Sequence, residues 1–271
     1  MKLSIVTPSY NQGKFIRKTF ERILSQNVDF TLEYILIDAI STDETAKVVK
    51  EFAPKFKTKN LDFKFICEKD QGQSNAINKG WKMATGDIVT YLNSDDFYES
   101  DVLQKVMDYF KNNPQIKWAY GGWNFVNKEG VLYKKVQPII FKKQKLLDYC
   151  NIAQPSCFFR KELLQEFGML DEKLHLTMDY DLWLRFATKY PAGIMNFIIS
   201  NMRYYLETKS GARTMEHLNE LFWLCKKHSK KFSWQRVRQI YYYLRGVAVI
   251  LIKKDITRRV NSKKYDKYLT F

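Results

Sequence analysis

Short apolar runs alternate with amphipathic segments through the first third of the chain. Four runs have the length of buried strands, at 3–8, 34–38, 62–67 and 86–92. Between them, apolar residues recur with helical spacing over 14–27, 41–53 and 74–84. Alternating strands and helices are typical of a mostly parallel sheet covered by helices on both faces. We therefore predict an α/β fold with a Rossmann-like central sheet.

Polar side chains follow the ends of the predicted strands. Asn11 follows the first strand, Asp38 ends the second, Asp70 follows the third, and Asp95 and Asp96 follow the fourth. Ligands of open parallel sheets bind at the carboxyl ends of the strands. We therefore expect these side chains to gather at one edge of the sheet.

Asp95 and Asp96 are adjacent like charges, which destabilise a fold when they are buried without compensation. Mg²⁺ and Mn²⁺ prefer oxygen ligands and commonly share one or two carboxylates with substrate phosphates. The pair therefore predicts a divalent-cation site that holds a diphosphate. The alternative is that the sequence NSDD (93–96) forms only a turn and the N-cap of a helix over 100–112.

The amino-acid composition limits the class of protein, and the net charge indicates which partners it binds. The chain has 271 residues, 45% of them hydrophobic, which suits one large domain or a domain with an appendage. Four cysteines without C-x-x-C spacing argue against a disulfide framework or a zinc site and fit a reducing compartment. The N-terminus predicts a strand rather than a signal peptide, and no apolar run reaches the roughly 20 residues that span a bilayer. We expect a cytoplasmic protein, whose net charge of +16 favours polyanionic partners.

Most of that charge lies in the C-terminal segment. Residues 226–271 contain 14 Lys or Arg and two acids, which gives 12 of the 16 net positive charges. Apolar residues recur there with helical spacing at Val237, Ile240, Tyr241, Leu244, Val247, Ala248, Leu251 and Ile252. A basic amphipathic helix predicts binding to an anionic membrane surface. The alternative is that this stripe packs on the preceding domain and the lysines are only solvated.

Five segments together carry a resemblance to a known family. They are SIVTPSYNQGKFI (4–16), YILIDAISTDET (34–45), EKDQGQSNAINKGWKMATGDIVTYLNSDDFY (68–98), QPSCFFRKELLQEFGMLDE (154–172) and MDYDLWLRFA (178–187). In order and spacing they resemble family 2 inverting glycosyltransferases of bacterial surface-polysaccharide type, which have the GT-A fold. The resemblance implies a catalytic domain over 1–214, with a nucleotide-sugar half over about 1–98 and an acceptor half over about 99–214. Residues 215–271 would then form a helical extension.

The resemblance also implies roles for the matching residues of the donor site. The nucleotide-sugar contacts would be Pro8, Tyr10, Asn11, Asp38, Asp70, Asn93 and Asp95. Asp95 and Asp96 would hold a divalent cation, Mn²⁺ or Mg²⁺, and the sequence does not decide which of the two contacts the ribose instead. Lys209 and Arg213 are candidate cations for the leaving diphosphate.

Other matching residues belong to catalysis and to the acceptor. Asp179 corresponds to the catalytic base of the family, and Asp181 is the second candidate, although it can instead pair with Arg185 at i+4. Gln154 is a candidate on the acceptor side. Trp123 is another, with packing in the core as its alternative.

One loop departs from the family pattern. Ala39 and Ile40 replace the glycines that usually follow the acid of the second strand. Glycine permits a positive φ, whereas β-branched Ile40 disfavours it. We therefore expect this loop to differ and the specificity for the base to be uncertain.

These expectations define a reaction. An acceptor hydroxyl attacks the anomeric carbon with inversion while a nucleoside diphosphate leaves, so a carboxylate must act as general base. The resemblance favours a uridine donor and an acceptor that is a glycan or a polyprenyl-diphosphate-linked chain, at the inner face of the cytoplasmic membrane. A catalytically weak nucleotide-sugar-binding protein and a nucleotidyltransferase are the alternatives, although the latter would need a glycine- and lysine-rich loop that 8–15 lacks. No nucleic-acid motif is present, and the sequence does not predict the oligomeric state.

Overall fold

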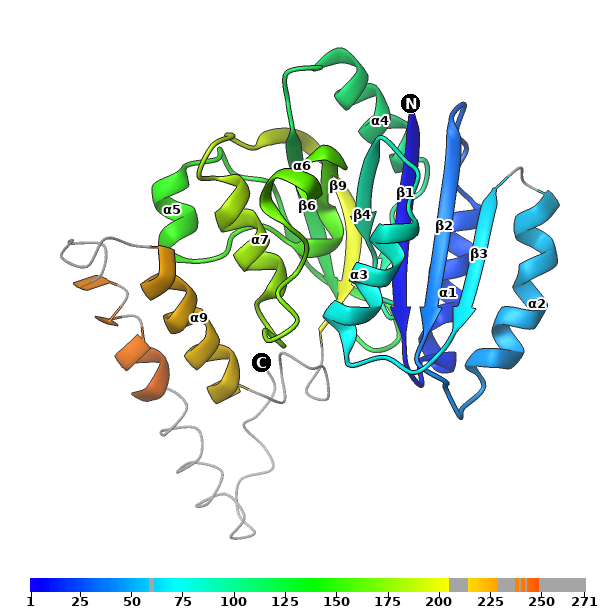
Figure 1. Cartoon of the computed structure of the whole chain (residues 1–271), viewed down its shortest axis with the longest axis horizontal. Coiled ribbons are helices and arrows are strands. Elements are labelled where there is room, and N and C mark those ends of the chain that lie inside the picture. The colour runs from blue at the N-terminus through cyan, green and yellow to red at the C-terminus, as the bar shows by residue number, and fades with distance from the viewer. Residues whose placement is uncertain (59–60, 205–213, 229–236, 239, 242, 249–271) are drawn as a thin grey trace, which may run out of the picture.

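The structure is a computed structural model that describes residues 1–58, 61–204, 214–228, 237–238, 240–241 and 243–248 (Figure 1). Its centre is a nine-stranded sheet with the order β3-β2-β1-β4-β8-β6-β9-β5, and β7 pairs with β6. The fold is mixed α/β with a mostly parallel sheet between helices, as predicted. None of the helices formed by the described residues is long and apolar enough to cross a bilayer.

The first part of the chain forms the parallel half of the sheet. Its strands are β1 (Lys2–Ser9), β2 (Thr31–Asp38), β3 (Asp62–Cys67) and β4 (Ile88–Tyr91). Its helices are α1 (Gly13–Leu24), α2 (Thr45–Thr58) and α3 (Gln73–Met83). Because each helix carries the chain back across the sheet, the carboxyl ends of these strands meet at one edge, at the lower end of the sheet in Figure 1.

The second part adds the other strands with mixed directions. They are β5 (Phe97–Tyr98), β6 (Trp118–Val126), β7 (Leu132–Val136), β8 (Cys157–Arg160) and β9 (Gly193–Arg203). The helices are α4 (Val102–Asn112), α5 (Lys143–Asp148), the 3₁₀ turn η1 (Gln154–Ser156), α6 (Glu162–Phe167), α7 (Met178–Phe186) and α9 (Thr214–His228). β8 runs antiparallel to β4 and so joins the two halves in one sheet.

Two hydrophobic cores lie on the two faces of the sheet. Apolar side chains of α1, α2 and α4 cover one face, where Phe20 and Phe56 lie with their ring centroids 5.4 Å apart. Those of α3, α5, α6 and α7 cover the other, where Trp118 and Trp183 stack at 5.9 Å. Leu224 of α9 joins this second core, so α9 packs on the same face of the domain as α7. The domain limits predicted from the sequence stay a prediction.

A buried carboxylate stabilises the edge of the sheet opposite the strand ends. Glu33 is 0% exposed, and its oxygens accept bonds from the side chain of Ser4 and from the amide of Thr85 at 2.8 Å. The ammonium of Lys64 lies 2.7 Å away and that of Lys2 lies 3.3 Å away. These partners outweigh the effect of burial and lower the pKa of Glu33 to about 2.

Candidate active site

Two neighbouring loops interlock at the carboxyl ends of β1 and β2. Asn11 has φ of 52°, its amide donates to Ser41 Oγ at 2.8 Å, and its Oδ1 accepts from the amide of Thr42 at 2.9 Å. Asp38 is buried, and both of its oxygens accept from Ser41: the amide at 2.8 Å and the hydroxyl at 2.6 Å. The Asp38 carboxylate is therefore held in one orientation beside the β1–α1 loop.

A second acid fixes the start of both helices that follow these loops. Asp43 accepts from the amide of Gly13 at 2.9 Å and from the amide of Thr45 at 2.9 Å. Gly13 leaves no room for a side chain, because an added Cβ would lie 2.3 Å from Glu44 Cγ. These bonds explain why α2 begins at Thr45 rather than at 41, the start expected from the sequence.

The backbone at Ile40 corrects the expectation for this loop. Ile40 has φ of 57°, the conformation that was expected to be disfavoured there, and its side chain is 53% exposed. The amide of Ala39 bonds the carbonyl of Ser9 at 2.9 Å, and Ser41 bonds Asp38, so both neighbours of Ile40 are fixed. The loop therefore takes a glycine-like path at a cost of about 1–2 kcal/mol.

The other predicted donor residues surround these loops. Pro8 is buried in β1, whereas the ring of Tyr10 is 61% exposed. Asp70 Oδ1 accepts from the amide of Gly72 at 2.8 Å and so shapes the turn before α3. Cys67 Sγ lies 3.7 Å from Asp38 Oδ2, a contact that the sequence analysis missed. The sequence offered no signal for it beyond the position of Cys67 at the end of β3.

A tight turn holds the two adjacent carboxylates after β4. The hydroxyl of Thr19 on α1 donates to the carbonyls of Ser94 and Asp96 at 2.9 and 2.7 Å. Asp96 is 2% exposed, and the amide of Arg203 donates to its Oδ1 at 2.9 Å. Asn93 Nδ2 lies 3.4 Å from Asp96 Oδ2. The alternative that NSDD caps the next helix is wrong, because β5 intervenes and α4 begins at Val102 after Asp101.

Arg203, which the sequence analysis also missed, links this turn to the end of β9. Its guanidinium donates to the carbonyl of Asp95 and to the carbonyl of Lys128. The same group lies between two rings, 5.0 Å from the centroid of Phe15 and 5.1 Å from that of Phe97. No sequence pattern places Arg203 beside Asp95, because the two are 108 positions apart.

Burial and mutual repulsion act on the two carboxylates of the turn. Burial raises the pKa of Asp95, and burial together with the charge of Asp95 raises the pKa of Asp96 well above its usual value. The positive charge of Arg203 lowers the pKa of each carboxyl, but by less than the other effects raise it. Among the described residues, no group of three or more His, Cys, Asp or Glu is arranged to hold a metal. A hard cation that takes its other ligands from a diphosphate and water fits two carboxylates.

Asp179 and Asp181 lie in the first turn of α7 with different surroundings. Asp179 is half-buried and accepts from the amide of Tyr180 at 2.9 Å. Tyr91 lies near enough to both Asp179 and Asp96 that, beside the larger effect of burial, their charges raise the pKa of its phenol. Asp179 and Asp96 therefore both lie near Tyr91, the last residue of β4.

Asp181 is instead part of a buried ion cluster. It is 1% exposed, with Arg185 Nε at 2.8 Å, Lys227 Nζ at 3.0 Å and His228 Nε2 at 3.2 Å. Despite burial, these partners hold the pKa of its carboxyl well below the usual value. The predicted i+4 pair with Arg185 is confirmed. Both oxygens of Asp181 are engaged within this cluster.

The two predicted acceptor-side residues lie on η1 and β6. Gln154 is 7% exposed and its Nε2 donates to the carbonyl of Tyr91, while Oε1 has no partner among the described residues. Trp123 is half-buried, with its ring centroid 6.1 Å from that of Phe125, and its Nε1 likewise lacks a described partner. Lys209 and Arg213 lie outside the described residues.

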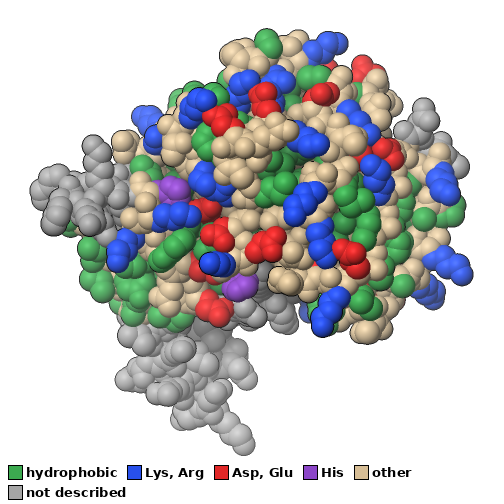
Figure 2. Space-filling model, viewed as in Figure 1, with side chains coloured by type: hydrophobic (Ala, Val, Ile, Leu, Met, Phe, Trp, Pro, Cys, Tyr) green, Lys and Arg blue, Asp and Glu red, His purple; other side chains and the backbone are tan. Residues whose placement is uncertain are grey.

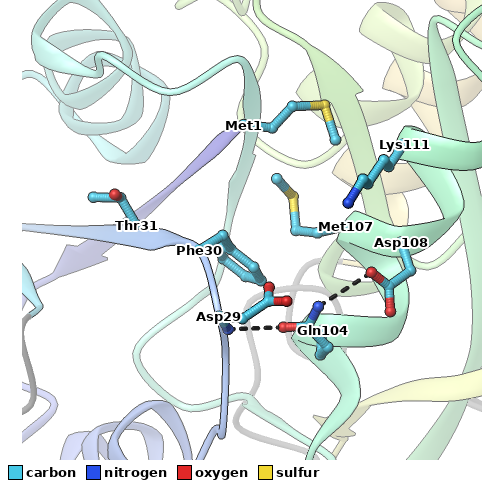
Figure 3. Close-up of a pocket in the computed structure, with 8 residues that line it drawn as sticks. All are labelled: Met1, Asp29, Phe30, Thr31, Gln104, Met107, Asp108 and Lys111. Carbon is cyan, nitrogen blue, oxygen red and sulfur yellow. Dashed lines mark hydrogen bonds between the residues drawn. The ribbon is translucent and has the colours of Figure 1, made fainter.

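A surface pocket lies far from these groups, at the opposite end of β2 (Figure 3). The amide of Asp29 donates to Gln104 Oε1 at 3.0 Å, and Gln104 Nε2 donates to Asp108 Oδ1 at 3.1 Å. The lining residues are Met1, Asp29, Phe30, Thr31, Gln104, Met107, Asp108 and Lys111. Because Asp38 ends the strand that Thr31 begins, this pocket is separate from the candidate active site.

Solved structures with the same arrangement of strands and helices identify the fold class. S. aureus TarS 1–349 in complex with UDP-GlcNAc aligns with a TM-score of 0.65 at 18% identity, over 88% of this chain and 69% of that chain. The mannosyltransferase PcManGT of Pyrobaculum calidifontis, in complex with GDP-Man and Mn²⁺, aligns at 0.63 and 16%, over 94% and 75%. The fold is the GT-A glycosyltransferase fold.

Sequence comparison then gives the family. The profile of glycosyl transferase family 2 matches residues 4–168, and the chain belongs to that family of glycosyltransferases. An uncharacterized glycosyltransferase of Methanocaldococcus jannaschii is 24% identical over 94% of this chain and 93% of its own. Poly-beta-1,6-N-acetyl-D-glucosamine synthase of Staphylococcus epidermidis is 29% identical over 66% of this chain, which spans 47% of that synthase. Chondroitin synthase of Escherichia coli is 26% identical, over 77% of this chain and 30% of that enzyme.

Proposed function

We propose that this glycosyltransferase moves a sugar, with inversion, from a uridine-diphosphate donor to a hydroxyl of a glycan or a lipid-linked glycan, with Mn²⁺ or Mg²⁺ bound at Asp95. The observation that carries the proposal is the adjacent pair of half-buried Asp95 and buried Asp96, whose raised pKa values indicate a shortage of positive charge. A divalent cation and the diphosphate it binds compensate such a pair. The roles below rest on this assignment.

The two carboxylates have different roles in the proposal. Both oxygens of Asp96 already contact protein groups, Arg203 and Asn93, so Asp96 shapes the turn. Asp95 is less buried than Asp96 and is therefore the proposed metal ligand. When bound, the cation supplies electrostatic stabilisation of the leaving diphosphate.

The nucleoside is proposed to lie over the interlocked loops. The exposed ring of Tyr10 offers a surface for the base, and the oriented carboxylate of Asp38 offers an acceptor for its N–H or for a ribose hydroxyl. Asn11 and Asp70 would shape the same donor site through the bonds that their side chains accept from the amides of Thr42 and Gly72, and Pro8 lies buried in β1 below it. Asn93 completes it from the acidic turn.

Asp179 is the proposed general base. A half-buried carboxylate at the first turn of α7 is able to accept the proton of an attacking hydroxyl, and Asp181 and its cations fix that turn in place. Gln154 Oε1, buried without a described partner, and Trp123 are the proposed acceptor contacts. The names of the relatives above, two of them polysaccharide synthases, support a glycan acceptor. Peripheral binding to the inner face of the cytoplasmic membrane would bring the enzyme to an acceptor anchored there.

The test is slow hydrolysis of nucleotide sugars in the absence of acceptor. A panel of UDP-, GDP- and dTDP-sugars is offered to the full chain with Mn²⁺ and with chelator, alongside Asp95→Asn, Asp179→Asn and the control Asp108→Asn, an exposed acid of the distant surface pocket. We expect cation-dependent turnover of one donor, lost in Asp95→Asn and reduced at retained donor affinity in Asp179→Asn. Binding of a donor without any turnover would favour the weak binding protein, and turnover unaffected by chelator would reject the cation site.

A further inference from the structure

A helical segment beyond α9 packs on α9 through one of its faces. Residues 237–238, 240–241 and 243–248 are helical. The phenol of Tyr243 donates to Asn219 Oδ1 at 3.0 Å, and its ring centroid lies 4.6 Å from that of Phe222. Gly246 lies against Leu218, since an added Cβ would be 2.9 Å from Leu218 Cδ1. The packing face is therefore the one that carries Tyr243 and Gly246.

A different face of the same segment is apolar and open to solvent. Val237, Ile240, Tyr241 and Leu244, here called the exposed stripe, are 54%, 42%, 60% and 60% exposed. They recur at i, i+3, i+4 and i+7, so they share one side of the helix. Figure 2 shows hydrophobic side chains gathered at the lower left of the molecule, where this segment lies. The alternative that these four residues pack on the catalytic domain is therefore wrong.

Cationic side chains border the exposed stripe. The side chain of Arg238 is 55% exposed and contacts Asp148 at 3.4 Å, and Arg245 is exposed one residue after Leu244. Residues 226–271 together carry 14 Lys or Arg and two acids. A second copy of the chain would bring two such segments together, and their charges would repel. An anionic surface with an apolar interior complements both the stripe and its border.

The segment is also connected to the candidate base. Glu220 of α9 accepts from the amides of Leu176 and Thr177, at 2.9 and 3.0 Å, directly before α7. Lys227 contacts Asp181 within α7. A surface bound through the exposed stripe would therefore lie in a fixed position relative to Asp179.

We propose that the exposed stripe is the docking face for an anionic lipid bilayer, with Ile240 and Leu244 inserted among the acyl chains and Arg238 and Arg245 at the headgroups. The proposal extends the peripheral membrane association of the proposed function by assigning its surface. It does not depend on the donor or on the metal.

The test is co-sedimentation of the full chain with vesicles, without any donor. One set of vesicles is phosphatidylcholine alone, and the other is an equal mixture with phosphatidylglycerol. The variant is Ile240→Glu with Leu244→Glu. The control is Phe65→Glu with Met83→Glu, two exposed apolar residues on β3 and α3 that change the net charge equally.

We expect binding to the mixed vesicles that weakens at high salt and little binding to phosphatidylcholine. The stripe variant should bind about tenfold or more weakly, because two apolar insertions are lost, and the control should bind like the native chain. Equal binding of the stripe variant and the control would overturn the proposal. The proposal would also be overturned if the native chain were a dimer, the stripe variant were a monomer, and neither bound vesicles. Donor hydrolysis is measured separately and should be unchanged in both variants. A failure of the proposed function is therefore distinguishable from a failure of membrane docking.

Discussion

Glu33 permits a quantitative prediction about stability, because it is a fully buried carboxylate with four described partners. The change is Glu33→Gln, which keeps the volume and removes the charge that Lys64 and Lys2 face at 2.7 and 3.3 Å. A pKa lowered from 4.5 to about 2 corresponds to about 3 kcal/mol of folding free energy at neutral pH, at about 1.4 kcal/mol per unit. We expect the variant to lose about that much stability at pH 7.

The pH dependence gives the sign of the effect. Because the pKa of Glu33 is lower in the folded state, its contribution is complete above about pH 4.5 and is lost as the pH falls toward about 2. The difference between native and variant chains should therefore shrink steadily from pH 5 to pH 3. Urea unfolding followed by tryptophan fluorescence at several pH values measures it.

An exposed acid provides the matched control. Glu51 also has a pKa lowered to about 2, by Arg17 at 2.6 Å and Lys55 at 3.1 Å, but its side chain is 43% exposed. Solvent screens such a pair, so Glu51→Gln should change stability far less than Glu33→Gln. Equal losses in the two variants, or a Glu33→Gln difference that does not depend on pH, would refute the reasoning from burial.

Three further predictions concern the candidate site. Ile40→Gly should stabilise the chain by about 1 kcal/mol at unchanged donor affinity, because it relieves a positive φ, and a lower urea midpoint would contradict this. Asp181→Asn should destabilise the chain by about 3 kcal/mol and lower the rate of donor hydrolysis per folded molecule far less than Asp179→Asn, which should lower that rate about 100-fold. Burial and the charge of Asp38 raise the pKa of the Cys67 thiol, so alkylation of Cys67, followed by peptide mass spectrometry, should be slow at pH 8 and faster in Asp38→Asn.

The parallel half of the fold was predictable because its signals are local. Each strand is a short apolar run and each helix has its own periodicity, so the order of Asp38, Asp70 and Asp95 at the strand ends follows from the alternation alone. The antiparallel insertion of β8 between β4 and β6 was not predictable in this way. It pairs Val89 with Phe159, a contact that depends on packing across the whole sheet.

The conformation of Ile40 was mispredicted for a related reason. Residue propensity disfavours a positive φ at Ile40, yet the residue adopts one, because bonds from Ser41 to Asp38 and from Ala39 to Ser9 fix both of its neighbours. The loop that carries Asp38 thus has a positive φ at residue 40 without a glycine there. Tertiary hydrogen bonds, not the identity of residue 40, determine it.

The surroundings of the acidic turn, unlike its two carboxylates, were not predictable from the sequence. The pair Asp95–Asp96 was visible as an anomaly, and the prediction that it needs compensation rests on charge alone. The sequence does not show which positive groups of the protein lie near the two carboxylates. Arg203 comes from the end of β9, and its guanidinium contacts the rings of Phe15 and Phe97 and donates to the backbone carbonyl of Asp95. It fixes the geometry of the turn while burial and the charge of Asp95 keep the pKa of Asp96 raised, and the cation of the proposed function would supply the opposing charge.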